Sequence, residues 1–248
     1  MKRIICICLI FILISGISVS AITFSSAEEN VVARNEDFAK SSPEAYIYVF
    51  LTQEMELSTA TACGILANIQ AESNFDHTAV GDEGKSYGIC QWHDPREGVG
   101  RWTALKEFCD KNGYDWETLD GQLYFLHHEL STLYPNTFRM IKNVTNDAEG
   151  AYSAAYDFCV YYEKPANPES KGIFRGNNAK VHFEKYHNRK KGDISGDKSV
   201  NGMDLLLMKK HILGIIKLTG ADYLSADMND DFKINGMDLL LLKKMILS

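Results

Sequence analysis

The chain begins with an apolar segment that predicts a secretory signal peptide. Lys2 and Arg3 give a short positive start, and residues 4–19 are apolar apart from small polar side chains. Small residues then fit a cleavage pattern at two places, after residue 21 and after residue 27. No later apolar run approaches the roughly 18–20 residues that a membrane-spanning helix needs. The pattern therefore predicts a secreted, extracellular protein without a stable membrane span.

A helical pattern of apolar residues begins at Thr59, directly after the favourable N-cap residue Ser58. The residues that recur on one helical face are Ala62, Ile65, Leu66 and Ile69. Glu72 follows Ile65 by seven residues, which places it within about 20° of the same face. A carboxyl group held against apolar surface has a raised pKa, as a general acid requires. The alternative is a glutamate at a helix end that turns toward water.

A segment rich in glycine, polar and aromatic residues follows this helix. Residues 80–92 are Val-Gly-Asp-Glu-Gly-Lys-Ser-Tyr-Gly-Ile-Cys-Gln-Trp, a composition typical of a turn or β-hairpin. Aromatic rings cover the C–H faces of sugars, while amides and hydroxyls bind sugar hydroxyl groups. A helix that carries a carboxyl group beside such a hairpin predicts a saccharide-binding cleft.

The remaining composition divides the chain into segments. Residues 28–42 are polar without apolar periodicity and predict a flexible tail. Residues 43–190 carry most of the aromatic residues and predict a globular domain, which ends in a short charged hinge at residues 188–192. Residues 191–248 are dominated by Asp, Leu and Lys, without Trp or Cys, and predict a separate small domain.

The overall composition excludes several protein classes. Of the 248 residues 45% are hydrophobic and 24% are charged, which excludes collagen-like and wholly disordered chains. The formal net charge of −7 argues against a nucleic-acid-binding protein, which needs a basic face.

Four cysteines remain after the signal segment: Cys63, Cys90, Cys109 and Cys159. They allow three disulfide pairings, and buried free thiols are an equal alternative. Cys90 with His93 could also form the nucleophile pair of a peptidase. The histidines contain no HxxxH pair, so we expect no catalytic metal.

The C-terminal segment contains an internal repeat, whose copies begin at Asp193 and Asp227, 34 residues apart. Each copy places oxygen-bearing side chains at loop positions 1, 3, 5, 9 and 12, the spacing with which twelve residues wrap a calcium ion; position 7 contributes its backbone carbonyl. The predicted ligands are Asp193, Ser195, Asp197, Ser199, Asn201 and Asp204 in the first loop, and Asp227, Asn229, Asp231, Lys233, Asn235 and Asp238 in the second. An amphipathic helix follows each loop.

Two motifs in the larger domain, Gln-Ala-Glu-Ser-Asn-Phe at residues 70–75 and Ser-Tyr-Gly-Ile-Cys-Gln-Trp at residues 86–92, resemble the lysozyme-like superfamily and most closely its phage-tail-type lysozyme domain. Residues 101–105, 119–130 and 158–165 also resemble its later segments. The resemblance implies a mainly α-helical α+β fold with a small β-hairpin. It also implies cleavage of the glycan strand of peptidoglycan without a catalytic cofactor.

The resemblance implies that Glu72 is the acid that protonates the glycosidic oxygen. Candidates for the base that activates water in an inverting hydrolase are Asp82, Glu83 and Asp94. If none of them reaches the site, the enzyme is a lytic transglycosylase, in which the sugar's own hydroxyl attacks. The predicted substrate-binding residues are Ser73, Tyr87, Gln91, Trp92 and Glu163. The first four could instead only pack the hairpin, and Glu163 could form a structural pair with Arg or Lys.

The repeat resembles a type I dockerin, which implies a small all-α module of two calcium-loop/helix repeats, two bound calcium ions and a cohesin module of a scaffoldin as partner. Loop position 6, usually Gly, is Lys198 in the first loop and Phe232 in the second, which carries a backbone penalty if φ is positive there. The positions that face cohesin in this family are Gly202, Met203, Lys209 and Lys210, mirrored by Gly236, Met237, Lys243 and Lys244.

Together these features predict a secreted, cellulosome-associated peptidoglycan glycosidase with Glu72 as general acid. A lytic transglycosylase acting on the same bond, a non-catalytic wall-binding protein and a chitinase are the alternatives.

Overall fold

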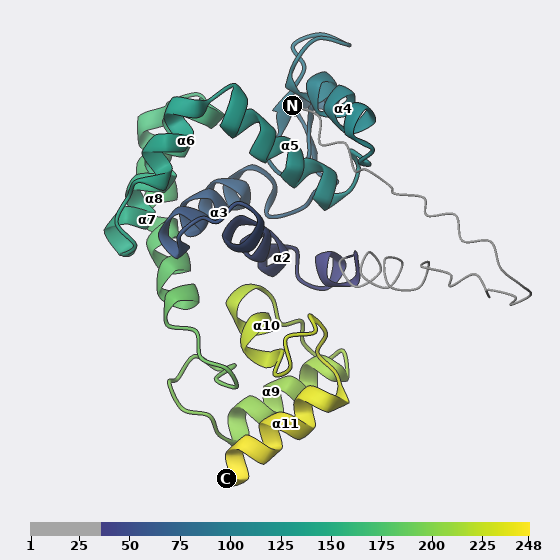
Figure 1. Cartoon of the computed structure of the whole chain (residues 1–248), viewed down its shortest axis with the longest axis vertical. Coiled ribbons are helices and arrows are strands. Elements are labelled where there is room, and N and C mark those ends of the chain that lie inside the picture. The colour runs from purple at the N-terminus through teal and green to yellow at the C-terminus, as the bar shows by residue number, and fades with distance from the viewer. Residues whose placement is uncertain (1–35) are drawn as a thin grey trace, which may run out of the picture.

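The structure is a computed structural model, and it describes residues 36–248. The predicted signal peptide and its cleavage sites lie outside the described residues. Within the described part, no helix combines the length and apolar character needed to cross a bilayer. A larger, mainly helical domain occupies one end of the molecule and a small helical domain the other (Figure 1).

Helices make up most of the larger domain, as predicted. They are α2 (Pro43–Val49), the π-helix η1 (Phe50–Glu54), α3 (Thr59–Ser73), α4 (Arg101–Asn112), α5 (Leu119–Thr132), α6 (Pro135–Lys142), α7 (Ala148–Phe158), the π-helix η3 (Cys159–Glu163) and α8 (Pro168–His187). Ser58 caps α3 as expected, because its Oγ accepts a hydrogen bond from the backbone nitrogen of Thr61 (3.2 Å). Asn74, in the left-handed conformation, ends the same helix.

Helix α3 lies at the centre of this domain. All of its residues from Ala60 to Ile69 are buried, so this stretch is covered on every side rather than on the one face that the apolar pattern predicts. Helices α7 and α8 pack closely on it: a Cβ atom added to Gly64 would lie 2.7 Å from the Cβ of Ala154. Glu72 lies in the last turn, beyond the buried stretch.

Three short strands form the predicted small hairpin. They are β1 (Val80–Gly81), β2 (Ser86–Tyr87) and β3 (Trp92–His93), antiparallel in the order β1-β2-β3, with the 3-10 turn η2 (Asp82–Gly84) between the first two. Gln122 of α5 ties this sheet to the helices, because its Oε1 accepts from Ile89 N (2.9 Å) and its Nε2 donates to His77 O (2.8 Å). Ser73 adds a hydrogen bond to Ile89 O (3.1 Å), which fixes the end of α3 against the hairpin.

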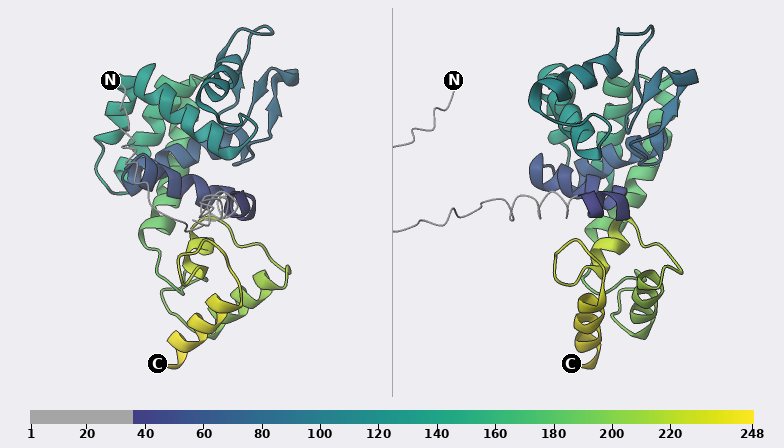
Figure 2. Two further views of the ribbon diagram at one scale, coloured as in Figure 1. Left: turned by 45° about the vertical axis from the view of Figure 1, so that its right-hand side comes forward. Right: turned by 90° about the vertical axis from the view of Figure 1, so that its right-hand side faces the viewer.

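The small domain contains α9 (Gly202–Ile212), α10 (Gly220–Ala226) and α11 (Gly236–Leu247). Helices α9 and α11 lie side by side at the end farthest from the larger domain (Figure 2). Each begins with a capping box, formed by Asn201 with Asp204 and by Asn235 with Asp238. The second half of each predicted calcium loop therefore also starts a helix.

The segment expected as a flexible tail, residues 28–42, is ordered in its described part. Residues 36–41 are helical, and Phe38 and Ser42 are buried. Phe38 packs in the same hydrophobic core as residues of both domains. A single aromatic residue in a polar segment has no periodicity, so the sequence pattern could not indicate this packing.

Candidate active site and calcium loops

Glu72 forms an ion pair across the two central helices. Its Oε1 accepts a hydrogen bond of 2.5 Å from Nη2 of Arg175 on α8. Arg175 is held from its other nitrogen, since Nη1 donates to Oδ1 of Asn68 (2.9 Å). The Arg175 side chain is 5% exposed and that of Glu72 is 19% exposed. The pair thus lies at the boundary between the protein interior and solvent.

Glu129 of α5 forms a second ion pair, in which the Glu129 side chain is 1% exposed and that of Arg101 is 27% exposed. Its carboxylate accepts hydrogen bonds from Nε and Nη2 of Arg101 (2.9 and 2.8 Å), from Nε1 of Trp92 (2.7 Å) and from Oη of Tyr162 (2.6 Å). The Arg101 guanidinium also lies over the Tyr162 ring, 4.4 Å from its centroid. Four donors satisfy this carboxylate in the interior, which makes it a structural anchor for the hairpin, α4 and η3.

Glu163, at the end of η3, lies near both pairs. Its Oε1 is inaccessible to solvent and accepts no hydrogen bond within the described part of the chain. Burial and, next in size, the charge of Glu72 raise the pKa of Glu163 to about 8, against the lowering effect of Arg101 and Arg175. With a proton on Glu163, the cluster of three carboxyl groups and two guanidiniums is electrically neutral. We call these five residues the carboxylate cluster: Glu72, Glu129, Glu163, Arg101 and Arg175.

The predicted substrate-binding residues of the hairpin form internal contacts. Trp92 is fully buried and bonded to Glu129, and Tyr87 is 8% exposed and stacked on Trp102 (centroids 5.2 Å apart). Gln91 donates to the backbone oxygens of residues 79 and 88, and Ser73 to those of residues 69 and 89. The structure brings these residues to the hairpin beside Glu72, where the polar groups of Ser73, Gln91 and Trp92 bind protein atoms.

The three candidate bases occupy different environments. Asp94 is buried, and its carboxylate accepts from N and Oγ1 of Thr103 (3.1 and 2.6 Å), which fixes the first turn of α4. Asp82 and Glu83 lie in the η2 turn at the solvent-exposed edge of the hairpin. Asp82 accepts from Ser86 Oγ (2.5 Å) and lies 3.5 Å from Nδ1 of His93. Asp94 therefore has a structural use, while the other two remain open to solvent.

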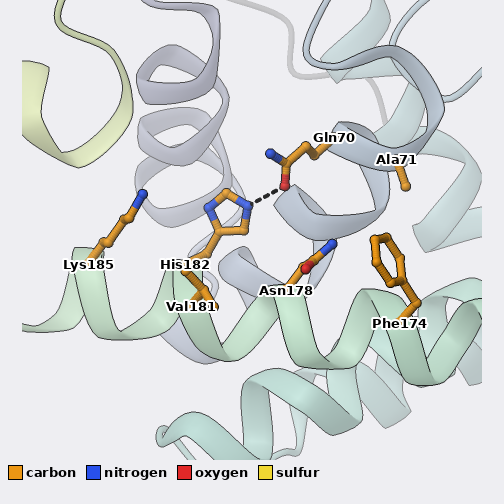
Figure 3. A pocket seen from close by; sticks show the side chains of 7 residues that line it. All are labelled: Gln70, Ala71, Phe174, Asn178, Val181, His182 and Lys185. Atoms are coloured by element: carbon orange, nitrogen blue, oxygen red, sulfur yellow. Dashed lines mark hydrogen bonds between the residues drawn. The ribbon is translucent and has the colours of Figure 1, made fainter.

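Two grooves combine aromatic and polar side chains, as sugar sites do. One, of about 390 Å³, is lined by Gln70 and Ala71 of α3 and by Phe174, Asn178, Val181, His182 and Lys185 of α8. Figure 3 shows Phe174 and Asn178 rising from α8 toward α3, and the hydrogen bond between Gln70 Oε1 and His182 Nε2 (2.9 Å). The other, of about 640 Å³, lies beside the hairpin and includes Arg96, Trp102 and Lys106.

The four cysteines are free, buried thiols. Burial raises the pKa of Cys90 well above its usual value, and its side chain is 2% exposed. A thiolate nucleophile needs the opposite environment, so the geometry argues against a Cys90–His93 peptidase. Across residues 36–248, no three His, Cys, Asp or Glu side chains form a metal site by themselves.

A calcium ion in either predicted loop would therefore need Ser, Asn and backbone oxygens as well as Asp. In both loops the carboxylates at positions 1 and 12 turn inward: Asp193, Asp204, Asp227 and Asp238 are 7%, 0%, 2% and 0% exposed. Burial raises the pKa of Asp227, and the charge of Asp238 adds to this. Buried like charges with oxygen donors around them fit a hard cation such as calcium, which would neutralise them.

The residues at loop position 6 adopt the strained conformation that the missing glycines imply. The φ angles of Lys198 and Phe232 are +73° and +60°. On the helices that follow, Met203 and Met237 are each 52% exposed. The other expected cohesin-facing residues, Gly202, Lys209, Lys210, Gly236, Lys243 and Lys244, are exposed apart from the half-buried Lys210.

Sequence reasoning assigned no role to Arg101, Glu129 or Arg175. One feature of the sequence could have indicated a role for Arg175. It interrupts a stripe of small and apolar residues on α8 that includes Gly172, Gly176, Ala179 and Phe183, all of which are buried. A charged residue on a buried helical face needs a buried partner.

Comparison with known protein families agrees with this division into two parts. A family model described as phage tail lysozyme matches residues 43–186, and one described as dockerin type I domain matches residues 191–247. The search of curated proteins found no match. The first domain indicates a peptidoglycan-cleaving enzyme of the lysozyme type, and the second indicates a calcium-binding module for cohesin and the cellulosome. Since the first match spans more than half of the sequence, the chain belongs to the phage tail lysozyme family, with a type I dockerin domain following the lysozyme domain.

Proposed function

We propose that this protein is a secreted glycosidase that cleaves the bond between N-acetylmuramic acid and N-acetylglucosamine in peptidoglycan. Glu72 is its general acid, and a dockerin with two calcium ions tethers it to a cohesin of a scaffoldin. The observation that supports this proposal is the difference in solvent exposure among the carboxyl groups of the carboxylate cluster.

Glu72 is the member of that cluster that a substrate can reach. Glu129 is 1% exposed and holds four hydrogen bonds, and the Oε1 atom of Glu163 is inaccessible. Glu72 keeps 19% of its side chain exposed at the end of α3, beside the hairpin. A general acid must come within hydrogen-bond distance of the glycosidic oxygen, which favours Glu72 over the other two.

Glu163 supports Glu72 as a positioning residue. Its raised pKa, about 8, keeps a proton in the cluster at neutral pH. A neighbouring protonated carboxyl group can supply the proton that Glu72 passes to the leaving oxygen, so that the two glutamates act together.

The second catalytic group distinguishes a hydrolase from a lytic transglycosylase. Glu129 is buried, the Oε1 atom of Glu163 is inaccessible and Asp94 is bonded to Thr103, so within the described residues near the hairpin Asp82 and Glu83 are the exposed candidate bases. The burial of Glu129 and the inaccessibility of Glu163 Oε1 favour the transglycosylase as the second candidate, because that reaction needs no activated water.

Mass spectrometry of the fragments released from purified peptidoglycan tests the proposal. Reducing ends indicate a hydrolase and anhydro ends a transglycosylase. We expect Glu72→Gln to abolish release, and Glu149→Gln, at a carboxylate whose side chain is 78% exposed in an exposed ion pair with Lys180, to leave it unchanged. Release by Glu72→Gln contradicts the assignment of the acid. No release from several wall types favours a wall-binding protein, and release from chitin oligomers without peptide stems favours a chitinase.

A further inference from the structure

Phe38, in the helical segment before the lysozyme domain, lies between the two domains. It is 1% exposed, and its ring stacks on Phe232 of the second calcium loop (centroids 4.8 Å apart, planes at 12°) and on Tyr223 of α10 (5.5 Å, 26°). The edge of Tyr46 from α2 completes the group at 5.4 Å. Phe38, Tyr46 of the larger domain and two residues of the dockerin thus share one aromatic core.

Polar contacts surround this aromatic group. The buried Ser42 Oγ accepts from Gly220 N (2.9 Å), and Lys233 of the second loop lies 3.5 Å from Asp37. Gly220 has a φ of +55°, and a Cβ atom there would lie 2.6 Å from the carboxyl group of Glu44. The positive φ favours glycine at this position, where α10 begins beside α2.

The same contact involves the backbone of the second calcium loop. Phe232 occupies loop position 6, where its nitrogen donates to Oδ2 of the first ligand, Asp227 (2.9 Å), and its oxygen accepts from Tyr223 Oη (3.0 Å). A bulky residue with a φ of +60° is strained, and stacking on Phe38 offsets this strain. The equivalent residue of the first loop, Lys198, is exposed.

We propose that residues 36–42 are an intramolecular docking segment for the second calcium loop, so that calcium binding by this loop and the packing of Phe38 stabilise each other. The loop conformation that presents Phe232 to Phe38 also directs backbone groups to the first calcium ligand. Any coupling of this kind is reciprocal, because each event favours the same conformation. The first loop, which has the same pattern of ligands without this partner, provides an internal comparison.

The docking segment leaves the expected cohesin-facing residues accessible. Met203 and Met237 are equally exposed, on helices that lie away from the larger domain (Figure 2). A cohesin could therefore bind while the docking segment is packed against the second calcium loop. The lysozyme domain would then be carried at a fixed orientation to the scaffold.

Calcium titration of the chain from residue 28 onward, followed by calorimetry, tests the coupling. We expect Phe38→Ala to weaken the second site about fivefold or more, the lower range of typical coupling, and to leave the first site unchanged. Lys198→Ala is the matched control at position 6 of the first loop, and we expect no change in the second site. Equal second-site affinities in the wild type and Phe38→Ala would overturn the proposal.

A double-mutant cycle separates coupling from general loss of stability. Phe232→Gly gives the loop a residue suited to positive φ and removes the ring that meets Phe38. In that background Phe38→Ala should have no further effect on calcium affinity. A persisting effect would show that Phe38 acts on the loop by another route and would contradict the proposal.

Trypsin cleavage after Lys40 gives a readout that is independent of wall cleavage. The Lys40 side chain is 72% exposed, so protection of this bond depends on the helical backbone of the segment. We expect faster cleavage when calcium is chelated and in Asp227→Ala, and wild-type protection in Asp193→Ala. Equal rates in the two Asp variants would overturn the proposal and leave the assignment of Glu72 unaffected.

Discussion

Arg175 and Glu72, which are 103 residues apart in the sequence, form a 2.5 Å hydrogen-bonded ion pair that joins α8 to the C-terminal end of α3. Asn68, one turn earlier on α3, binds the same guanidinium. The half-buried glutamate is thus held from the protein interior, while 19% of its side chain remains exposed to solvent. This arrangement fixes the carboxyl group in position without closing the site.

We expect Arg175→Ala to destabilise the lysozyme domain by about 3 kcal/mol, since removing one partner of a buried pair leaves an uncompensated charge. Urea unfolding measures the change. Lys180→Ala is the control, because its partner Glu149 is largely exposed and such pairs contribute less than about 1 kcal/mol. A loss no larger than that of the control would show that Arg175 does not hold Glu72.

The stability that Glu163 contributes should fall as the pH rises from about 4.5 to about 8. The pKa of Glu163 is about 8 in the folded protein and lies near its ordinary, lower value in the unfolded chain. Between these values the folded state binds one proton more than the unfolded state, so stability decreases with rising pH. Glu163→Gln removes this proton binding and should flatten the dependence, measured as the urea midpoint from pH 5 to 9.

The activity of the same variant separates two roles of Glu163. If Glu163 supplies a proton to Glu72, Glu163→Gln should lower kcat, change the pH profile and leave KM unchanged. An unchanged pH profile of kcat would restrict Glu163 to a structural role. For the urea measurements on Glu163→Gln, Glu83→Gln is the control variant, because Glu83 is exposed in the η2 turn.

Trp92→Phe should weaken the fold rather than substrate binding. The indole Nε1 donates to the buried Glu129 carboxylate, and a hydrogen bond to a charged group contributes about 1.5–3 kcal/mol. Phe keeps most of the apolar contact. We expect the free energy of unfolding to drop by an amount in this range and KM for soluble glycan fragments to stay constant. A raised KM with unchanged stability would restore the sugar-binding role that the sequence motif suggested.

The features that the sequence predicted correctly are local ones. The Ser58 cap, the hairpin after α3 and the two loop-helix repeats each depend on residues within about a dozen positions, where spacing fixes geometry. Glu72 could be placed at a helix end for the same reason.

The surroundings of Glu72 could not be predicted, because they depend on long-range packing. Arg101, Glu129 and Glu163 come from three different elements and meet only in the folded chain. The environment of Trp92 also depends on long-range packing. Its motif suggested a sugar contact, whereas folding buries the ring against α5. Phe38 was missed because its partners, Tyr223 and Phe232, lie in the other domain.

The near-identity of the two dockerin repeats leads to a prediction about cohesin binding. Met203 and Met237 occupy equivalent helix starts and are 52% exposed, so either copy should dock. Either Met203→Asp or Met237→Asp alone removes docking through one of the two repeats. Each single variant should therefore bind a type I cohesin about twofold more weakly. The double variant, which places a charge in both apolar contacts, should bind at least about tenfold more weakly.

Chelation of calcium should abolish binding, since each helix start depends on an Asp that is also a predicted ligand. Calorimetry measures all of these, with Val181→Asp on α8, 56% exposed, as the control. Full loss of binding in either single variant would show that one copy alone docks.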